Sequence, residues 1–306
     1  MTTKLRDESD GRTVRLVSQG PTGKTSASHE TLRTKMSTLE HKTRKTVSRE
    51  TDDPTIRLAH IEGAQGSNVL RGRHGVIRVP DSSLPALLVS YYYVKGFLAK
   101  QSEYRYRDWA LDSGAFSAAS QGEKIDLNEF TDKAAQLLHD DPTLTEVFAL
   151  DVIGDPEATM RNTEKMVAAG VPAIPAFHYG SAWHYLEDMA KRFPKIALGG
   201  AVGLKGNTKL DWAKQCFARI WPKRVHGFGF GSERAAMEIP FHSVDATNWQ
   251  LGATKFGTWQ SFGGAQLSIK GSNQNLRSEI EHYLRIERRA RRRWAATWTA
   301  VRDKLR

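Results

Sequence analysis

Short apolar runs alternate with amphipathic stretches along most of this chain, beginning near Ile56. Nearly continuous apolarity over a short run is typical of strands that are buried on both faces of a parallel sheet. Between the runs, Asp126 and Asp155 each precede a helical pattern as capping residues, and Pro156 follows in the first turn of the second helix. The expected strands are Ile56–Ile61, Ala86–Tyr92, Trp109–Leu111, Val147–Asp151, Ala173–Phe177, Ile196–Gly199, Val225–Phe230 and Phe241–Asp245.

Eight strands that alternate with helices predict an α/β fold, a closed (β/α)8 TIM barrel over residues 56–271. A doubly wound open sheet is the alternative arrangement for the same pattern. The weakest part of the pattern is Gly63–Gly75, between the first two strands, which looks more like a loop than a helix.

Two segments of different character flank the predicted barrel. Residues 1–55 are polar and contain few large apolar side chains, so we expect a disordered tail. Residues 272–306 predict a strongly basic helix, in which Trp294, Trp298, Val301 and Leu305 recur at helical spacing and should pack on the barrel.

The basic helix also contains a dense run of positive charge. Its arginines are either a solvated face or a patch that binds phosphate, and the absence of interleaved acids favours the patch. The candidate nucleic-acid-binding residues are Arg288, Arg289, Arg291, Arg292 and Arg293.

Composition narrows the class of protein. Hydrophobic residues make up 39% of the 306 residues, enough for a substantial core, and no apolar run is long enough for a transmembrane helix. The first residues lack the apolar stretch of a signal peptide, and the single cysteine, Cys216, excludes an internal disulfide and a multi-thiolate metal site. We therefore expect a cytoplasmic protein with no membrane partner. The net charge of +11 indicates a polyanionic partner, with nucleic acid the first candidate.

The ends of the predicted strands carry the candidate chemistry, because active sites of such barrels lie at the carboxyl ends of the strands. A single aspartate there usually caps a helix or forms a turn, but three together indicate a site. The residues at these ends are Asp112, Asp151, His178, Gly199, Gly200, Phe228, Gly229 and Asp245.

Two carboxylates beside an anomeric carbon are what cleavage of a glycosidic bond requires. One attacks the carbon and forms a covalent ester, while the other moves protons on the departing and incoming groups. The glycines let a planar base lie against backbone, and Phe116 and Phe228 are placed to clamp its faces.

Several segments resemble, in the family's order, motifs of the tRNA-guanine transglycosylase superfamily. Leu111–Phe116 looks like its Asp-Ser-Gly-Gly-Phe signature, and Ala149–Asp151 falls where the family has its base-recognising aspartate. Leu198–Gly203 is similar to its Gly-Gly-Leu-Ala-Val-Gly turn, Gly227–Gly231 resembles its Met-Gly-Val-Gly stretch, and Val244–Asp245 falls at its nucleophile.

The resemblance implies a division of labour between two acids. Asp245 would be the nucleophile that forms a covalent ester with the sugar. Asp112 would be the general acid/base.

The remaining positions would bind the base. Asp151 would bind the guanine-like edge, and the Gly199–Gly200 turn would donate an amide hydrogen to its carbonyl oxygen. Phe116 and Phe228 would sandwich the ring. His178 lies where the family often has an amide side chain, so it either contacts the base or packs structurally.

The zinc site of the tRNA enzymes, three cysteines and a histidine after the nucleophile, is missing from this sequence. The resemblance therefore implies no cofactor and points to the compact phage and bacterial branch that inserts 7-deazaguanine derivatives, such as the 7-cyano form, into DNA. The expected partners are DNA and the free 7-deazaguanine base. The alternatives are a tRNA-guanine transglycosylase acting on tRNA, a catalytically silent nucleic-acid-binding barrel, and a sugar hydrolase or aldolase.

Overall fold

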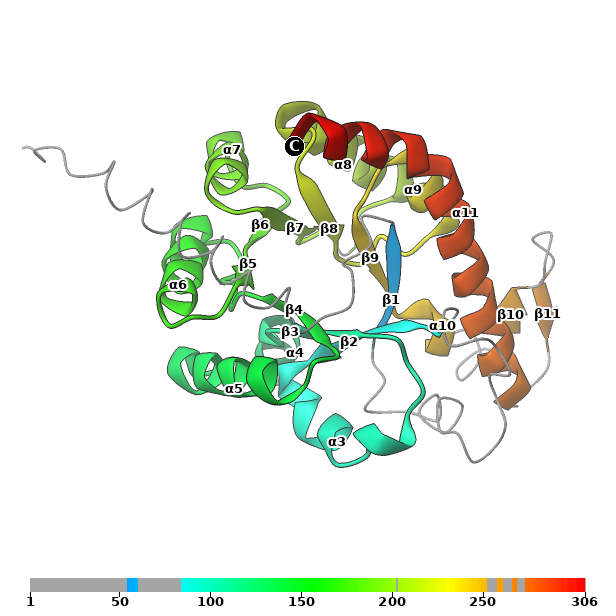
Figure 1. The fold of residues 1–306 in the computed structure, drawn as a ribbon, viewed down its shortest axis with the longest axis horizontal. Helices are drawn as coiled ribbons and strands as arrows, with labels where there is room; N and C mark the ends of the chain where they lie inside the picture. Colours follow the sequence, from blue (N-terminus) through cyan, green and yellow to red (C-terminus); the bar gives the residue numbers. More distant parts are fainter. Residues whose placement is uncertain are drawn as a thin grey trace, which may run out of the picture.

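The computed structural model describes residues 54–59, 84–201, 203–251, 258–260, 266–268 and 273–305. Parallel strands surround a central axis and helices cover the outside, which confirms the predicted TIM-barrel type of fold (Figure 1). The strands are β1 (Thr55–Ala59), β2 (Ala86–Ser90), β3 (Trp109–Asp112), β4 (Leu144–Phe148), β5 (Ala173–Ile174), β6 (Ala176–His178), β7 (Lys195–Gly199), β8 (Arg224–Gly227), β9 (Ser243–Ala246), β10 (Thr258–Gln260) and β11 (Gln266–Ser268). The helices are η3 (Tyr91–Tyr93), α3 (Val94–Leu98), η4 (Gln101–Glu103), α4 (Ala115–Ser120), α5 (Leu127–Asp140), α6 (Pro156–Ala168), α7 (Trp183–Arg192), α8 (Gly206–Ile220), α9 (Glu233–Glu238), α10 (Asn248–Leu251) and α11 (Asn273–Leu305).

The main sheet has the order β5-β4-β3-β2-β1-β9-β8-β7-β6, with parallel neighbours throughout. Its two outermost strands, β5 and β6, are separated in the chain only by Pro175. The amide of Ala149 donates to the carbonyl of Ile174 at 2.8 Å, and the amide of Ala197 donates to that of Pro175 at 2.8 Å. The sheet therefore returns on itself at Pro175, as a barrel does and an open sheet does not.

Among the described residues, three predicted strands run two or three residues past the carboxyl ends that the structure gives them. β4 ends at Phe148, so Asp151 lies in the following loop and not at the strand end. β8 ends at Gly227, which places Phe228 in a turn, and β2 ends at Ser90 before a 3-10 turn. The predicted strands are too long because apolar residues continue into the loops that follow them. Ala149 and Leu150, for example, are buried although they lie outside β4.

Side chains alternate between the inside of the barrel and the layer under the helices. The inner set is small enough to fill a narrow interior, with Phe228 packed against it. It comprises Ala59, Leu88, Ala110, Phe148, Ile174, Ala176 and Ala197.

Charged side chains fill the amino half of the interior. We call Arg57, Asp108, Glu146 and Lys195 the amino-end ion cluster. Arg57 Nη1 lies 2.7 Å from Asp108 Oδ1, its Nη2 lies 3.3 Å from Glu146 Oε2, and Lys195 Nζ also bonds Glu146. Burial alone would raise the pKa of Glu146, but the cations Lys195 and Arg57 hold that pKa well below its usual range.

Both predicted helix caps on aspartates are confirmed. Asp126 Oδ1 accepts from the amides of Asn128 and Glu129 at 2.8 and 2.9 Å. Asp155 Oδ1 accepts from the amide of Ala158 at 2.8 Å. Each side chain satisfies backbone donors that the first turn leaves unpaired.

α11 packs lengthwise against β1 and α9, in the position of the helix that follows a barrel's last strand (Figure 1). Ile280, Leu284 and Ala290 lie in the core. Glu287 is buried, and its Oε2 accepts from the amide of Ile56 at 2.9 Å. α11 is therefore an integral part of the barrel wall.

The expected apolar face of α11 is confirmed where its side chains are described. Trp298 and Val301 are buried, and Trp294 Nε1 donates to the carbonyl of Ala236 at 2.8 Å. The side chain of Leu305 and the tail over residues 1–53 lie outside the described residues.

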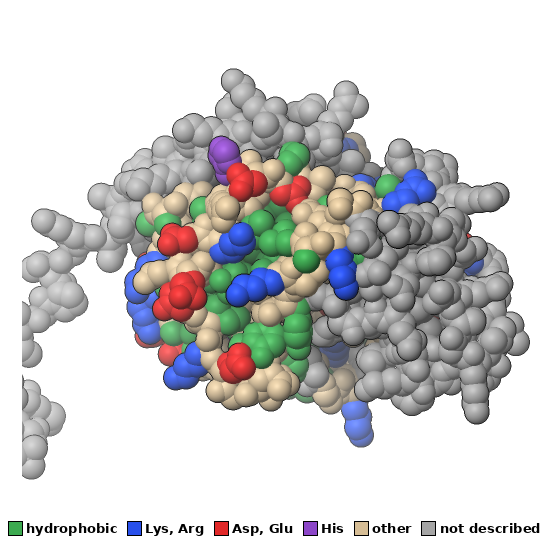
Figure 2. All heavy atoms as spheres, turned by 90° about the horizontal axis from the view of Figure 1, so that it is seen from below, with side chains coloured by type: hydrophobic (Ala, Val, Ile, Leu, Met, Phe, Trp, Pro, Cys, Tyr) green, Lys and Arg blue, Asp and Glu red, His purple; other side chains and the backbone are tan. Residues whose placement is uncertain are grey.

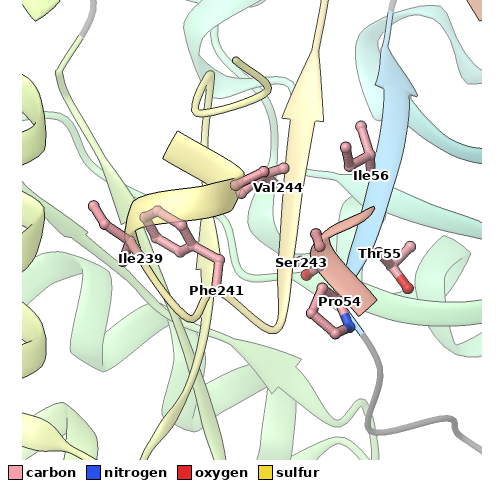
Figure 3. Close-up of a pocket in the computed structure, with 9 residues that line it drawn as sticks. Pro54, Thr55, Ile56, Ile239, Phe241, Ser243 and Val244 are labelled. Carbon is pink, nitrogen blue, oxygen red and sulfur yellow. The ribbon is translucent and has the colours of Figure 1, made fainter. Parts of the chain in front are cut away.

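A small, largely apolar cavity lies where β1 and β9 meet α9 and α11. Thr55 and Ile56 line it from β1, and Ser243 and Val244 line it from β9 (Figure 3). Its apolar lining belongs to the packing of α11 on the barrel, with no cluster of charged groups to bind a ligand.

The positive charge of the protein is not concentrated on the face that Figure 2 shows. Figure 2 shows one side of the molecule, where acidic and basic side chains are interspersed around hydrophobic ones. In the described part of the chain, no helix has the length and apolarity to cross a membrane.

Candidate active site at the carboxyl end of the barrel

Two of the predicted acids face the interior of the barrel. Ala110 packs inside and Leu111 outside, so the alternation along β3 turns Asp112 inward. Val244 packs outside, so its neighbour Asp245 on β9 also turns inward. In the sheet order β2 and β1 lie between these strands. Both carboxylates therefore belong to the inner wall of one barrel.

A tight turn follows Asp112. Its Oδ2 accepts from the amide of Gly114 at 3.1 Å, and Gly114 has a φ of +77°. A Cβ at this position would lie 2.8 Å from both Ser90 Oγ and the amide nitrogen of Tyr92. Glycine is needed here for its left-handed backbone and for the close approach of β2.

Asp151 is held through both of its carboxylate oxygens. Ser113 Oγ donates to Oδ1 at 3.0 Å, and His178 Nε2 lies 2.9 Å from Oδ2. The contacts join the loops after β3 and β4 to the end of β6. The structure thus brings Asp151 and His178 together, although Asp151 lies beyond its strand.

The Gly199–Gly200 turn accommodates the same imidazole. His178 is paired in register with Gly199, and a Cβ at Gly199 would lie 3.0 Å from His178 Cδ2. A Cβ at Gly200, whose φ is +69°, would lie 3.0 Å from His178 Cβ. A side chain at either position would therefore crowd His178, and the predicted contact of these glycines with a base stays a prediction.

Asp245 is 5% exposed and is held through one oxygen. The amide of Gly229 donates to Oδ1 at 2.6 Å, and His226 Nε2 lies 3.6 Å from the same atom. The turn after β8 therefore brings a neutral backbone donor to the predicted nucleophile.

The two predicted aromatic clamps lie in different surroundings. Phe228 packs toward the barrel interior, its ring centroid 4.8 Å from Phe148 and 4.7 Å from His226. Phe116 lies on α4 and is 64% exposed. Among the described aromatic contacts, none joins these two rings, so a sandwich between them stays a prediction.

Sequence reasoning missed two residues beside Asp245. Lys209 Nζ donates to the carbonyl of Gly229 at 2.7 Å; burial lowers the pKa of Lys209, and the charge of Asp245 opposes that effect. His226 lies at an inward position of β8, two residues before Phe228. Strand alternation could have found His226, but Lys209 projects from α8 and depends on tertiary packing.

The predicted arginine patch lies at the other end of the barrel. Arg291 Nε donates to the carbonyl of Pro54, the residue before β1, at 3.1 Å, and its Nη2 lies 2.7 Å from Glu287. A helix that follows the last strand returns along the barrel, so its second half reaches the amino ends of the strands. The patch is therefore remote from the rim that carries Asp112 and Asp151.

The five arginines also differ in their partners. Arg289 pairs with Glu233, and Arg293 lies 4.7 Å from the ring centroid of Trp294. Arg288 and Arg292 are exposed. Acids outside the run therefore pair with two of its arginines, Glu233 on α9 with Arg289 and Glu287 on α11 with Arg291, and binding of nucleic acid by the run stays a prediction.

Among the described residues, no group of three metal-ligating side chains gathers. Cys216 is buried in α8, and burial raises the pKa of its thiol to about 12. This thiol is inert at neutral pH.

Comparison with known proteins supports no family assignment: no family model matches, and no curated protein matches. Among solved structures, the carboxyl transferase domain of Rhizobium etli pyruvate carboxylase has 12% identity and a TM-score of 0.43, over 90% of this chain and 54% of that chain. A putative fructose-1,6-biphosphate aldolase from Coccidioides immitis has 13% identity and a TM-score of 0.46, over 83% of this chain and 94% of that chain. This chain thus spans about half of the carboxyl transferase chain. Both neighbours are enzymes, and likeness at this level says nothing about substrate.

Proposed function

We propose that this protein exchanges guanine in DNA for a 7-deazaguanine derivative, such as the 7-cyano form, through a covalent ester on Asp245. The observation that carries the proposal is that Asp112 and Asp245 both face the barrel interior and that each accepts a bond from a backbone amide. A backbone amide orients a carboxyl group without forming an ion pair with it, so the group stays available as nucleophile or general acid/base. The resemblance to the transglycosylase motifs supplies the substrate class.

In the first half of the reaction Asp245 attacks C1′ of the target deoxyguanosine. The C1′–N9 bond breaks, its electron pair leaves with guanine, and Asp112, which enters this step as the protonated acid, gives the departing base its proton. In the second half the incoming deazaguanine attacks C1′ through N9 and loses its N9 proton to Asp112. The ester breaks and Asp245 is regenerated as a carboxylate.

Asp151 is suited to recognise both bases. Guanine and its 7-deaza analogues present the same donors, N1–H and the exocyclic amine, on the Watson–Crick edge, and a carboxylate accepts from both. Ser113 and His178 fix the orientation of this carboxylate. Because the two bases differ at position 7 and not on this edge, one pocket would serve both halves of the exchange.

DNA is favoured over tRNA because the zinc module of the tRNA enzymes is missing from the sequence, and the net charge of +11 suits either nucleic acid. A duplex target must be turned out of the stack, which costs a few kcal/mol. Phosphate contacts by basic residues would offset that cost.

The decisive experiment incubates purified protein with radiolabelled guanine and either duplex DNA or tRNA. We expect label in DNA, and a covalent protein–DNA adduct on a denaturing gel. Asp245→Asn should abolish both, with a loss of at least about 10³-fold. Asp211→Asn, which changes an exposed aspartate on α8, is the matched control and should leave the rate unchanged.

Other outcomes select the alternatives. Label in tRNA alone would assign the chemistry to tRNA. DNA binding without label in either nucleic acid would indicate a silent binding barrel. An adduct that persists in Asp245→Asn would place the nucleophile elsewhere.

A further inference from the structure

A line of buried polar atoms runs through the barrel interior from the amino-end ion cluster to Asp245. Lys195 Nζ lies 2.8 Å from Ser243 Oγ, and Ser243 Oγ lies 2.8 Å from His226 Nδ1. His226 Nε2 then lies 3.6 Å from Asp245 Oδ1. The four side chains come from three neighbouring strands, β7, β8 and β9.

The direction of these bonds follows from the first donor. Lys195 contacts the Glu146 carboxylate, so its ammonium form is favoured, and an ammonium only donates. Ser243 Oγ therefore accepts from Lys195. The hydroxyl proton of Ser243 is then directed to its other neighbour, His226 Nδ1, which accepts it.

The imidazole of His226 is neutral, because burial lowers its pKa. A neutral imidazole has a single N–H. Since Nδ1 accepts from Ser243, the hydrogen must be on Nε2. That nitrogen is buried and aimed at Asp245, and no described partner lies within hydrogen-bond distance of it.

Aromatic packing keeps the imidazole in this orientation. The ring centroids of Phe148 and Phe228 lie 4.6 and 4.7 Å from that of His226. His226 itself is completely buried. Rotation of the ring would require both phenylalanines to move, so the tautomer set by Ser243 is presented to Asp245 in one geometry.

We propose that His226 is a positioning residue, fixed by Lys195 and Ser243 as the Nε2–H tautomer, which holds Asp245 Oδ1 so that Oδ2 is the atom that bonds C1′. Oδ1 already accepts from the Gly229 amide, and among the described residues none donates to Oδ2. The part that names the attacking atom rests on the proposed transglycosylase function.

The same arrangement serves both halves of the exchange. When Oδ2 forms the ester, Oδ1 becomes its carbonyl oxygen and still accepts from the Gly229 amide, with the Nε2–H of His226 directed at it from 3.6 Å. When the ester breaks, the electron pair of the C1′–Oδ2 bond returns to the carboxylate, and the two donors stabilise the returning charge.

The first test measures the tautomer itself and needs no activity. Long-range ¹H–¹⁵N correlation spectra of the full chain should show His226 as the Nε2–H tautomer at neutral pH, with the signal assigned by its loss in His226→Gln. Ser243→Ala should abolish the tautomer preference. An Nδ1–H tautomer or an imidazolium in the wild type would overturn the inference.

The second test separates positioning from structure by kinetics. His226→Phe removes the donor but keeps an aromatic ring, and should lower kcat about 10- to 100-fold, as loss of an orienting partner does, with KM unchanged. His226→Gln can place an amide donor near the Nε2 position and should recover most of the lost kcat. His139→Phe, on the exposed end of α5, is the matched control.

The outcomes distinguish this inference from the proposed function. If the wild type exchanges no base in DNA or tRNA, the proposed function fails while the tautomer measurement still decides the role of Ser243. If exchange occurs but His226→Phe and His226→Gln lose the same kcat, the donor role of His226 is wrong. If His226→Phe does not fold, the tautomer spectra of the wild type and Ser243→Ala decide alone.

Discussion

Acidic side chains at the two ends of the barrel interior have different kinds of partners. In the amino half, buried acids meet buried cations, and the pKa of Glu146 is held well below its usual range. At the carboxyl end, the acids accept from amides and a hydroxyl and lie beside imidazoles, and Lys209, which lies beside Asp245, bonds the carbonyl of Gly229. The first group is Arg57, Asp108, Glu146 and Lys195, and the second is Asp112, Asp151 and Asp245.

The difference separates a structural role from a chemical one. A buried carboxylate between cations is neutralised, and removal of either partner leaves an uncompensated charge, so the cluster resists change. A carboxyl group oriented by backbone amides or a hydroxyl is not neutralised by those contacts. Only the second kind can attack carbon or accept a proton.

The largest effect is expected from breaking the ion cluster. Glu146→Ala leaves Lys195 and Arg57 without their shared acid in a buried site, and should lower the free energy of unfolding by about 3–5 kcal/mol. Urea denaturation followed by circular dichroism measures the loss. Glu187→Ala, which removes an exposed acid on α7, should leave the midpoint unchanged. A stable Glu146→Ala protein would show that the cluster contributes little.

The same cluster predicts the response to acid. The folded pKa of Glu146 is lowered relative to the unfolded value of about 4.3, so the unfolded state binds more protons as pH falls. Its stabilisation is therefore present above about pH 4.3 and is lost progressively below it. Denaturation at a series of pH values should show a steeper loss for wild type than for Glu146→Gln. Equal slopes would contradict the assignment.

A smaller effect is expected at the carboxyl end from Gly199→Ala. The added Cβ would displace His178 from Asp151, and should raise KM for the base about tenfold, or about 1.4 kcal/mol of binding, with unfolding little changed. Gly96→Ala is the control, since a Cβ there has nothing within 4 Å. The steady-state rate as a function of base concentration measures KM. An unchanged KM would show that His178 does not contribute to binding of the base.

The smallest effect is expected from Arg288→Gln combined with Arg292→Gln. These exposed arginines lie on α11 beside Arg291, which bonds Pro54 at the amino end. The slope of log Kobs against log salt for long DNA should fall by about 1 per lost phosphate contact, with kcat on a short oligonucleotide unchanged. Arg289→Gln, whose parent side chain pairs with Glu233, is the control. A fall in kcat on the short substrate would place the arginines nearer the site.

The sequence predicts those features of the structure that depend on the pattern of neighbouring residues, and it does not predict contacts between residues on different elements. The alternation of apolar runs is local and predicts the barrel, and the placement of Asp112 and Asp245 follows from strand periodicity. Asp151 was assigned to a strand end because Ala149 and Leu150 continue the apolar pattern into a buried loop. Contacts such as Lys209 with the turn at Gly229 join positions on different elements, and no pattern along the chain contains them.

The bond between Glu287 and the amide of Ile56 joins positions that are 231 residues apart. One backbone amide of the first strand thus receives its hydrogen-bond acceptor from α11. During synthesis, β1 leaves the ribosome long before α11 has been made. The barrel therefore cannot be completed around β1 until α11 is available to pack against it. Assembly of this protein should therefore be completed only after α11 has been released. A shortened chain that lacks α11 would be impaired in folding, so a loss of nucleic-acid binding in that chain would not identify α11 as the binding helix.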